Sequence, residues 1–334
     1  MLQFNSVTAK DITTLEQAVF LSNETGLSIS TPPDLEETFI EFLGLDVADG
    51  NASQDTIVNY KSQVKLYLQW CINTATNPLM ATKKNIQEYR AYLVKQNYKP
   101  ATIALKINVV RRFYDGAITH GLVTNNPVKN VKAPIERVAP ASSVRYLELE
   151  QLKTLFKLTE GRSEKLRRDR VIIGLMALHG LRTIEVARLN FEDIKEQGER
   201  KFITVSAKRS QRLLKLRSDF SLWLLDYLAT KKALTSKTPI VTSLSGNSLG
   251  KRLTRSGLRR IINSYLEQAG LRDCSTDGIK LSNHTLRHTF ATQVYASTKD
   301  LRLVQEALGH GNPQTTAKYA HVVDGVSAAD CIEF

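Results

Sequence analysis

The sequence has few cysteines and no long hydrophobic run, and each of these absences excludes a class of protein. Its 334 residues include three cysteines, Cys71, Cys274 and Cys331, which lie far apart and form no CxxC or Cys/His ligand spacing. This predicts reduced thiols and argues against a disulfide-stabilised scaffold or a zinc site. The longest apolar runs, such as residues 171–178, are too short to span a bilayer. We therefore expect no membrane partner.

Signals for export and for nucleotide or metal chemistry are also missing. The first residues, MLQFNSVTAKDITTLEQ, lack the basic flank and apolar core of a signal peptide. The sequence contains no P-loop and no cluster of acids suited to two metal ions. It therefore predicts a cytoplasmic protein without a cofactor or a metal site.

Positive charge, by contrast, is abundant and unevenly distributed. The net charge is +13, yet residues 1–50 hold one cation, Lys10, and nine acids, a net charge of −8. The other residues hold 45 cations and 24 acids, a net charge of +21. This basic body favours nucleic acid as a partner, because cations that neutralise phosphates release condensed counterions. The alternative is a ribosome-associated or merely basic enzyme.

The hydrophobic pattern indicates an N-terminal head, two folded domains and a tail. The head, 1–33, ends at two prolines, and residues 131–143 have the composition of an extended linker. Between them, apolar residues recur at helical spacing over 54–72, after a capping Thr82 and from about Pro100. The smaller domain is therefore predicted to be all-helical.

The larger domain is predicted to combine helices with a short hairpin. Two β-like runs, 202–206 and 212–216, flank a polar turn. Gly180 stands where a helix C-cap is expected. Helical patterns cover six segments: 147–158, 170–179, 254–268, 284–296, 300–308 and 312–319. The expected fold class is mostly α with a small antiparallel β-sheet, in two domains, followed by a tail over 323–334.

Three short motifs contain residues that suit chemistry on a phosphate. They are HGLRTIE at 179–185, HTLRH at 284–288, and LGHG at 308–311, with Tyr319 nine residues after His310. Guanidinium groups bind phosphate oxygens bidentately and stay charged at any working pH. An imidazole can transfer protons near neutral pH, and a phenol can be a covalent nucleophile. Each residue alone is more typical of a surface or core position, so the signal lies in their order and spacing.

The motifs GLRTIE, HTLRH and LGHGNPQTTAKYAHV resemble those of the tyrosine recombinase, or phage integrase, family over about residues 36–322. The resemblance implies a two-domain DNA clamp with a helical, SAM-like core-binding domain (34–130) and an α+β catalytic domain (144–322). It implies site-specific recombination or integration of DNA through a 3′-phosphotyrosyl intermediate, without metal or ATP. The acidic head is unlike the basic arm-binding domain of some phage integrases, which favours a simple, Xer-like enzyme.

The resemblance also implies roles for single residues. The matched set comprises two phosphate-binding arginines, two assisting histidines and a nucleophilic tyrosine: Arg182, Arg287, His284, His310 and Tyr319. Glu185 matches the acidic residue that positions the first arginine. Lys208 matches the catalytic lysine of a hairpin turn, which would protonate the leaving 5′-oxygen. The turn AKRSQ lacks the usual glycines and is shorter than the usual form, so Arg209 and Lys215 are alternatives.

The implied partner is double-stranded DNA at a specific recombination site, bound by a homo-tetramer on two such sites. Binding of this kind implies association with the nucleoid, and the resemblance names no accessory protein. The candidate DNA-binding residues are basic side chains on two predicted helices: Lys106, Arg111, Arg112, Arg255, Arg259 and Arg260. For each of them, a solvated charged face is the alternative.

Other functions remain open at this point. His284 and His288 are four residues apart and could face one metal ion, as in a metal-dependent nuclease, although Arg287 between them would repel a cation. His288 alone is more typical of a packing or capping residue. A DNA-binding regulator without activity, or a topoisomerase- or resolvase-type enzyme of related chemistry, would share the motifs. A covalent-trapping assay followed by a two-site recombination assay separates these alternatives.

Overall fold

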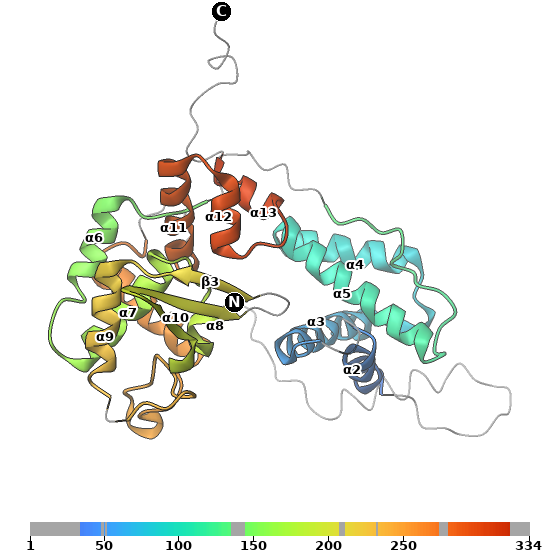
Figure 1. Cartoon of the computed structure of the whole chain (residues 1–334). Helices are drawn as coiled ribbons and strands as arrows, with labels where there is room; N and C mark the ends of the chain where they lie inside the picture. Colours follow the sequence, from blue (N-terminus) through green and yellow to red (C-terminus); the bar gives the residue numbers. More distant parts are fainter. Residues whose placement is uncertain are drawn as a thin grey trace, which may run out of the picture. The chain divides into compact units, whose positions relative to one another are not determined.

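The computed structural model divides the chain into two compact units, Met1–Arg137 and Val138–Phe334 (Figure 1). The division falls inside the segment predicted to be the linker. The predicted head and tail, 1–33 and 323–334, lie outside the described residues, as does most of the linker. The structure describes residues 34–47, 50, 52–134, 144–206, 211–231, 233–273 and 280–320.

The described part of the first unit is helical. It comprises α2 (Leu35–Leu45), α3 (Gln54–Asn73), the 3-10 helix η1 (Pro78–Met80), α4 (Lys83–Lys95) and α5 (Pro100–Thr119). Asp34, Ser53 and Thr82 each cap a helix by accepting hydrogen bonds from first-turn N–H groups. The helices predicted over 54–72, after Thr82 and from Pro100 are confirmed, while α2 is not among the predicted segments.

Aromatic side chains form much of the core of the first unit. Phe39, Tyr67, Phe113 and Tyr114 are all buried. The Tyr114 hydroxyl donates a hydrogen bond to the carbonyl of Pro78 (2.8 Å) and lies 2.6 Å from the Tyr67 hydroxyl, which is therefore the donor to it. This chain of partners joins α3, α5 and η1, and it satisfies polar groups that would be costly to bury alone.

The second unit contains helices and one small sheet. Its helices are α6 (Leu149–Lys157), α7 (Glu164–Ala177), α8 (Thr183–Arg188), η2 (Phe191–Asp193), α9 (Ser218–Leu228), η3 (Gly246–Ser248), α10 (Arg255–Gln268), α11 (Asn283–Thr298), α12 (Leu301–Leu308) and α13 (Gln314–Ala317). Its strands are β1 (Ile194–Gln197), β2 (Arg200–Ser206) and β3 (Gln211–Lys215), which pair antiparallel in that order. The predicted fold class is confirmed.

Two predicted helices have different lengths in the structure. The helix predicted over 170–179 begins earlier in the structure, at Glu164. Its first turn is mostly charged and shows no apolar pattern, so the sequence does not indicate this part of the helix. The helix predicted over 312–319 is a single turn, α13, that follows Pro313. The structure also adds β1 and α9 to the predicted elements.

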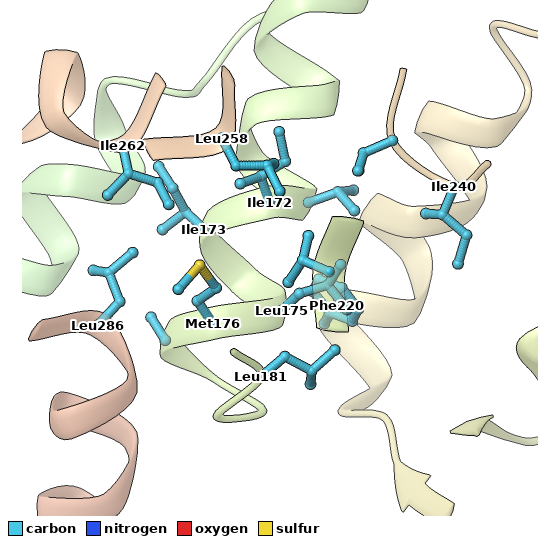
Figure 2. Packing of buried hydrophobic residues seen from close by; sticks show 14 of the residues in the cluster. Ile172, Ile173, Leu175, Met176, Leu181, Phe220, Ile240, Leu258, Ile262 and Leu286 are labelled. Carbon is cyan, nitrogen blue, oxygen red and sulfur yellow. The ribbon is translucent and has the colours of Figure 1, made fainter. Parts of the chain in front are cut away.

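Helix α7 lies at the centre of the core of the second unit (Figure 2). Ile173 and Met176 of α7 pack in one apolar cluster with Leu286 of α11. On the side of α9, a Cβ added to Gly174 would lie 2.6 Å from the Phe220 ring, so glycine permits the close approach of these helices. Burying one such large apolar side chain contributes roughly 1.5–3 kcal/mol. Leu286 anchors α11 in this core and so fixes the position of the neighbouring Arg287.

Two further findings concern membranes and thiols. None of the helices in the described part of the chain combines the length and apolar character needed to cross a bilayer. Cys71 is a buried free thiol, whereas Cys274 and Cys331 lie outside the described residues. Burial raises the pKa of Cys71 to about 12, so the thiol stays protonated and packs as a small apolar group.

Candidate active site

The first part of the site is the turn between α7 and α8. Gly180 adopts a φ of +68°, and a Cβ there would lie 2.4 Å from the ring of Phe290 on α11. Both the backbone conformation and the close approach therefore require glycine. The turn places Arg182 at the N-cap of α8, with its side chain half-buried.

Glu185 of α8 holds Arg182 in place. Its carboxylate accepts hydrogen bonds from the Arg182 backbone N–H (2.7 Å) and from Arg182 Nη1 (2.9 Å). Burial alone would raise the pKa of Glu185, but hydrogen bonds from Arg212 and from the Arg182 backbone outweigh it, so the pKa is below its ordinary value. The contact expected between Glu185 and Arg182 is present, and its role in catalysis stays a prediction.

Arg287 of α11 approaches the same carboxylate. Its guanidinium donates to the carbonyl of Gly180 and, at 2.7 Å, to that of Leu308, and its Nη1 lies 3.7 Å from Glu185 Oε2. The residue is 5% exposed. Burial and then the charge of Arg182 lower its pKa to about 9, which leaves it charged at neutral pH. The structure thus brings the two predicted phosphate-binding arginines together.

The two predicted histidines lie close to these arginines. His284 lies in the first turn of α11, and partial burial of its ring, then the charges of Arg259 and Arg287, lower its pKa. His310 follows the left-handed Gly309, and its Nδ1 lies 2.9 Å from the Thr316 hydroxyl. Burial and then the charges of Arg287 and Arg182 lower the pKa of His310 to about 4. In both histidines the shift favours the neutral ring.

Tyr319 completes the predicted set. Its ring is 1% exposed and belongs to an apolar cluster formed by α11 and α12. Burial raises the pKa of its hydroxyl to about 12, and the charges of Arg287 and Arg182 oppose this increase. The phenol is thus protonated at neutral pH, and the positive charges of both arginines act on it.

The residue that contacts this phenol is His288, which the sequence indicates only as a packing or capping residue. Its Nδ1 lies 2.8 Å from the Tyr319 hydroxyl. Burial and then the charge of Lys318 lower the pKa of His288 to about 3, so the ring is neutral and can accept a hydrogen bond. Its position one turn after His284 is the sequence signal for a shared helix face. Within the described residues, no three His, Cys, Asp or Glu side chains come together as a metal-ligand cluster.

Two more cations lie at the site beyond those expected. Arg212 of β3 binds Glu185 through both carboxylate oxygens, at 3.0 and 2.9 Å. The Nζ of Lys318 lies 5.2 Å from the centre of the Tyr319 ring. The sequence places Arg212 on a strand and Lys318 beside the tyrosine, but side-chain direction and long-range pairing are not readable from spacing.

The catalytic lysine expected in the hairpin lies outside the described residues. Lys208 and the alternative Arg209 belong to residues 207–210, which stand between β2 and β3 in the sequence. The other alternative, Lys215, is described: it pairs with Phe202 at the end of β3, whereas Gln211 pairs with Ser206 at its start.

The DNA-binding candidates of the second unit are exposed on α10. Arg255, Arg259 and Arg260 follow Thr254, which caps the helix. The charge of Arg259 acts on His284, which places this arginine near the site.

The candidates of the first unit differ from one another. Lys106 is buried: its Nζ donates to Gln63 (2.8 Å) and lies 4.8 Å from the Tyr98 ring centre. That buried position fits neither the expected phosphate contact nor the alternative of a solvated charged face. Arg111 donates to the Val131 carbonyl, and Arg112, exposed, pairs with Asp115 at 3.4 Å.

Comparison with known proteins agrees with this geometry. The model of the phage integrase family matches residues 145–325, and that of the phage integrase N-terminal SAM-like domain matches 38–121. Tyrosine recombinase XerC of Herpetosiphon aurantiacus is 27% identical over 290 residues, covering 86% of this chain and 91% of the relative. XerC of Pelotomaculum thermopropionicum is 30% identical over 242 residues, covering 71% and 75%.

Solved structures with a similar fold are also integrases or recombinases. A lambda integrase tetramer bound to a Holliday junction aligns with a TM-score of 0.66 at 16% identity, covering 99% of this chain and 92% of that one. The named recombinases among the relatives do not favour a topoisomerase-type enzyme or a silent regulator. The chain therefore belongs to the phage integrase family and is a tyrosine-type site-specific recombinase.

Proposed function

We propose that this recombinase cuts and rejoins DNA through Tyr319, which attacks the scissile phosphate and forms a 3′-phosphotyrosyl bond. One observation carries the proposal: the Tyr319 hydroxyl is hydrogen-bonded to an imidazole, and the charges of two guanidiniums act on it. These groups come from α8, α11 and the segment after α12, which are far apart in the sequence. A covalent nucleophile, a proton acceptor and a phosphate clamp are the parts that such a reaction requires.

Arg182 and Arg287 neutralise the non-bridging phosphate oxygens as charge builds in the transition state. Both approach Glu185, with Arg182 Nη1 2.9 Å from Oε1 and Arg287 Nη1 3.7 Å from Oε2. Fixed guanidiniums supply the positive charge that metal ions supply in many phosphoryl-transfer enzymes. We therefore expect cleavage to proceed without a metal ion.

The proton of Tyr319 passes to His288 as the bond to phosphorus forms. The 2.8 Å hydrogen bond to Nδ1 provides the path. Burial, and then the charge of Lys318 and other nearby groups, hold the pKa of His288 down in the free protein. A phosphodiester anion bound among these cations offsets their charge and raises the basicity of the ring. His284 and His310 donate further hydrogen bonds to the phosphate.

The bond from phosphorus to the bridging 5′-oxygen breaks, and Lys208 gives this oxygen a proton. General acids of this kind contribute on the order of 10²–10⁴ in rate. Rejoining reverses each step: the 5′-hydroxyl of the second strand attacks phosphorus, and Tyr319 leaves with its proton restored. The phosphotyrosyl bond conserves the energy of the phosphodiester, so no ATP is consumed.

The partner is double-stranded DNA at a recombination site, and the working assembly is a homo-tetramer on two sites. The lambda integrase structure supports this part of the proposal, because it is a tetramer bound to a Holliday junction. Arg255, Arg259 and Arg260 are exposed on α10 and provide cations for the backbone phosphates. Arg111 and Arg112 are the remaining candidates on the first unit, and binding to DNA implies association with the nucleoid.

Covalent trapping tests the proposal. The protein is incubated with a nicked suicide substrate in excess EDTA and run on a denaturing gel, and we expect a protein–DNA adduct. Tyr319→Phe should bind DNA and form no adduct. Tyr295→Phe is the matched control, because Tyr295 lies in the same apolar cluster, and it should form the adduct normally. An adduct with Tyr319→Phe, or one that appears only with Mg²⁺, would overturn the proposal.

A further inference from the structure

Three arginines meet at Glu185. Arg212 binds both carboxylate oxygens, with Nη1 3.0 Å from Oε1 and Nη2 2.9 Å from Oε2. Arg182 donates to Oε1 at 2.9 Å, and Arg287 Nη1 lies 3.7 Å from Oε2. The Arg212 side chain is 12% exposed and the Glu185 side chain 4%, so this bidentate pair is largely shielded from water. Three positive groups around one negative group leave a net charge of +2.

A carboxylate in this position competes with DNA for the two phosphate-binding arginines. Carboxylate and phosphate oxygens are bound by the same N–H groups of a guanidinium. Without Arg212, the full charge of Glu185 would fall on Arg182 and Arg287. With Arg212 present, both oxygens of Glu185 are engaged by a guanidinium that lies outside the predicted phosphate clamp.

Arg212 also holds the segment that leads to His310. Its Nε donates to the carbonyl of Ala307, at 3.1 Å, in the last turn of α12. A Cβ added to Gly309 would lie 2.7 Å from Arg212 Nη1, so the backbone passes directly over this guanidinium. Arg212 follows Lys208 by four residues in the sequence. A single side chain thus connects β3, α8 and the end of α12.

We propose that Arg212 is a positioning residue that neutralises Glu185, so that Arg182 and Arg287 keep their positive charge for the scissile phosphate. This inference rests on the proposed function, because it assigns Arg212 a part in the same cleavage reaction. With its charge neutralised by Arg212, Glu185 can fix the direction of Arg182 without cancelling the positive charge of Arg182 and Arg287.

A double-mutant cycle tests the role of charge. We expect Arg212→Gln to slow single-turnover cleavage of the suicide substrate by about 10–100-fold, less than the loss of a group that contacts the phosphate. Affinity for the intact site should change little, because many other cations contact the backbone. In the double variant with Glu185→Gln, the uncompensated carboxylate is gone. Its rate should therefore exceed that of Arg212→Gln alone.

A matched control separates charge balance from structure. Arg252 donates to the carbonyls of Ala187 and Leu189, at 3.0 and 3.2 Å, at the other end of α8, and no bond to Glu185 is formed there among the described contacts. Arg252→Gln therefore removes comparable backbone hydrogen bonds without uncovering the carboxylate. We expect it to lower the unfolding midpoint and to leave the cleavage rate of folded protein near that of wild type.

Changing the leaving group distinguishes an effect of Arg212 on Arg182 and Arg287 from an effect on Lys208. A substrate with sulfur at the bridging 5′ position needs little protonation, so it bypasses the general acid. The defect of Arg212→Gln should persist on this substrate. Full rescue would show that Arg212 acts through Lys208, and a double variant no faster than Arg212→Gln would show a purely structural role; either result overturns the inference. A wild-type protein that forms no adduct would instead overturn the proposed function.

Discussion

Both units bury a tyrosine hydroxyl, and the surroundings of the two hydroxyls are different. In the first unit, Tyr114 is bonded to Tyr67 and to the Pro78 carbonyl, and burial raises its pKa well above the ordinary range. In the second unit, the Tyr319 hydroxyl faces His288, and the charges of Arg287 and Arg182 oppose the effect of burial. The same side chain is a structural hydrogen-bonding group in one unit and, in the proposed mechanism, a nucleophile in the other.

In the proposed mechanism, a buried phenol becomes reactive when a proton acceptor and positive charge are placed beside it. Tyr114 has partners that satisfy its hydroxyl but cannot take its proton or stabilise its anion. Tyr319 has an imidazole that can take the proton and cations that favour the charged form. Substitutions that remove the arginines or the imidazole one at a time test this difference, and substitutions of the structural His179 and Tyr114 provide the contrast.

Removing a clamp arginine should have the largest effect. We expect Arg182→Ala to slow single-turnover cleavage on the order of 10²–10³-fold, because one charged donor to the phosphate is lost. Arg287→Ala should be at least as slow and also less stable, since the carbonyls of Gly180 and Leu308 lose their donor. Cleavage rates and urea unfolding of both variants provide the measurement. Wild-type cleavage by Arg182→Ala would contradict the account.

Removing the imidazole should make Tyr319 resemble Tyr114. We expect His288→Ala to slow cleavage by about 10²-fold at neutral pH. The phenol, with its pKa raised to about 12, must then ionise without a partner. Below that pKa the phenolate fraction grows about tenfold per pH unit, so the rate of the variant should rise steeply between pH 7 and 9. A pH–rate profile parallel to that of wild type would exclude His288 as the proton acceptor.

His179 provides the structural counterpart of His288. Its Nδ1–H donates to the Gly174 carbonyl (3.1 Å), and its Nε2 accepts from the Arg217 N–H (3.2 Å). Burial lowers its pKa from 6.5 to about 4, so only the unfolded chain binds a proton between these values. Stability should be complete above pH 6.5 and fall by roughly 3 kcal/mol as the pH drops to 4.

Chemical unfolding between pH 7 and 4.5 measures this effect. His179→Gln should be less stable at pH 7, and its stability should depend less on pH than that of wild type. Equal pH dependence in both proteins would show that His179 does not titrate as a buried neutral group.

The smallest effect is expected for the structural tyrosine. Tyr114→Phe leaves the Tyr67 hydroxyl and the Pro78 carbonyl without their partner, at a cost of about 1–2 kcal/mol. Cleavage by the folded variant should equal that of wild type. Thermal unfolding and adduct formation measured on the same sample decide the point, and loss of adduct at full stability would contradict it.

Much of the fold follows from sequence periodicity, but some elements do not. The helices capped by Thr82 and Thr254 are predicted because capping residues and apolar spacing agree. Strand β1 is not predicted, because Ile194 is its single apolar residue and its other side chains are exposed. Helix α9, SDFSLWLLDYL, mixes buried and exposed apolar residues, including Leu222 at 67% exposure, so it lacks a clear polar face.

The site is predictable as far as motifs extend. Arg182, Arg287 and Tyr319 are brought together as expected. The contact of His288 with Tyr319 and the pairing of Arg212 with Glu185 join residues 31 and 27 positions apart. Such pairings depend on tertiary packing, which spacing in the sequence does not encode.

Mapping the attachment point of trapped DNA tests the central claim most directly. The adduct formed in EDTA is digested with protease and nuclease, and the peptides are analysed by mass spectrometry. The account predicts a nucleotide joined through its 3′-phosphate to Tyr319, in the peptide that begins after Lys318. Attachment to Tyr295 or to any other residue, or recovery of unmodified Tyr319 from trapped protein, would contradict it.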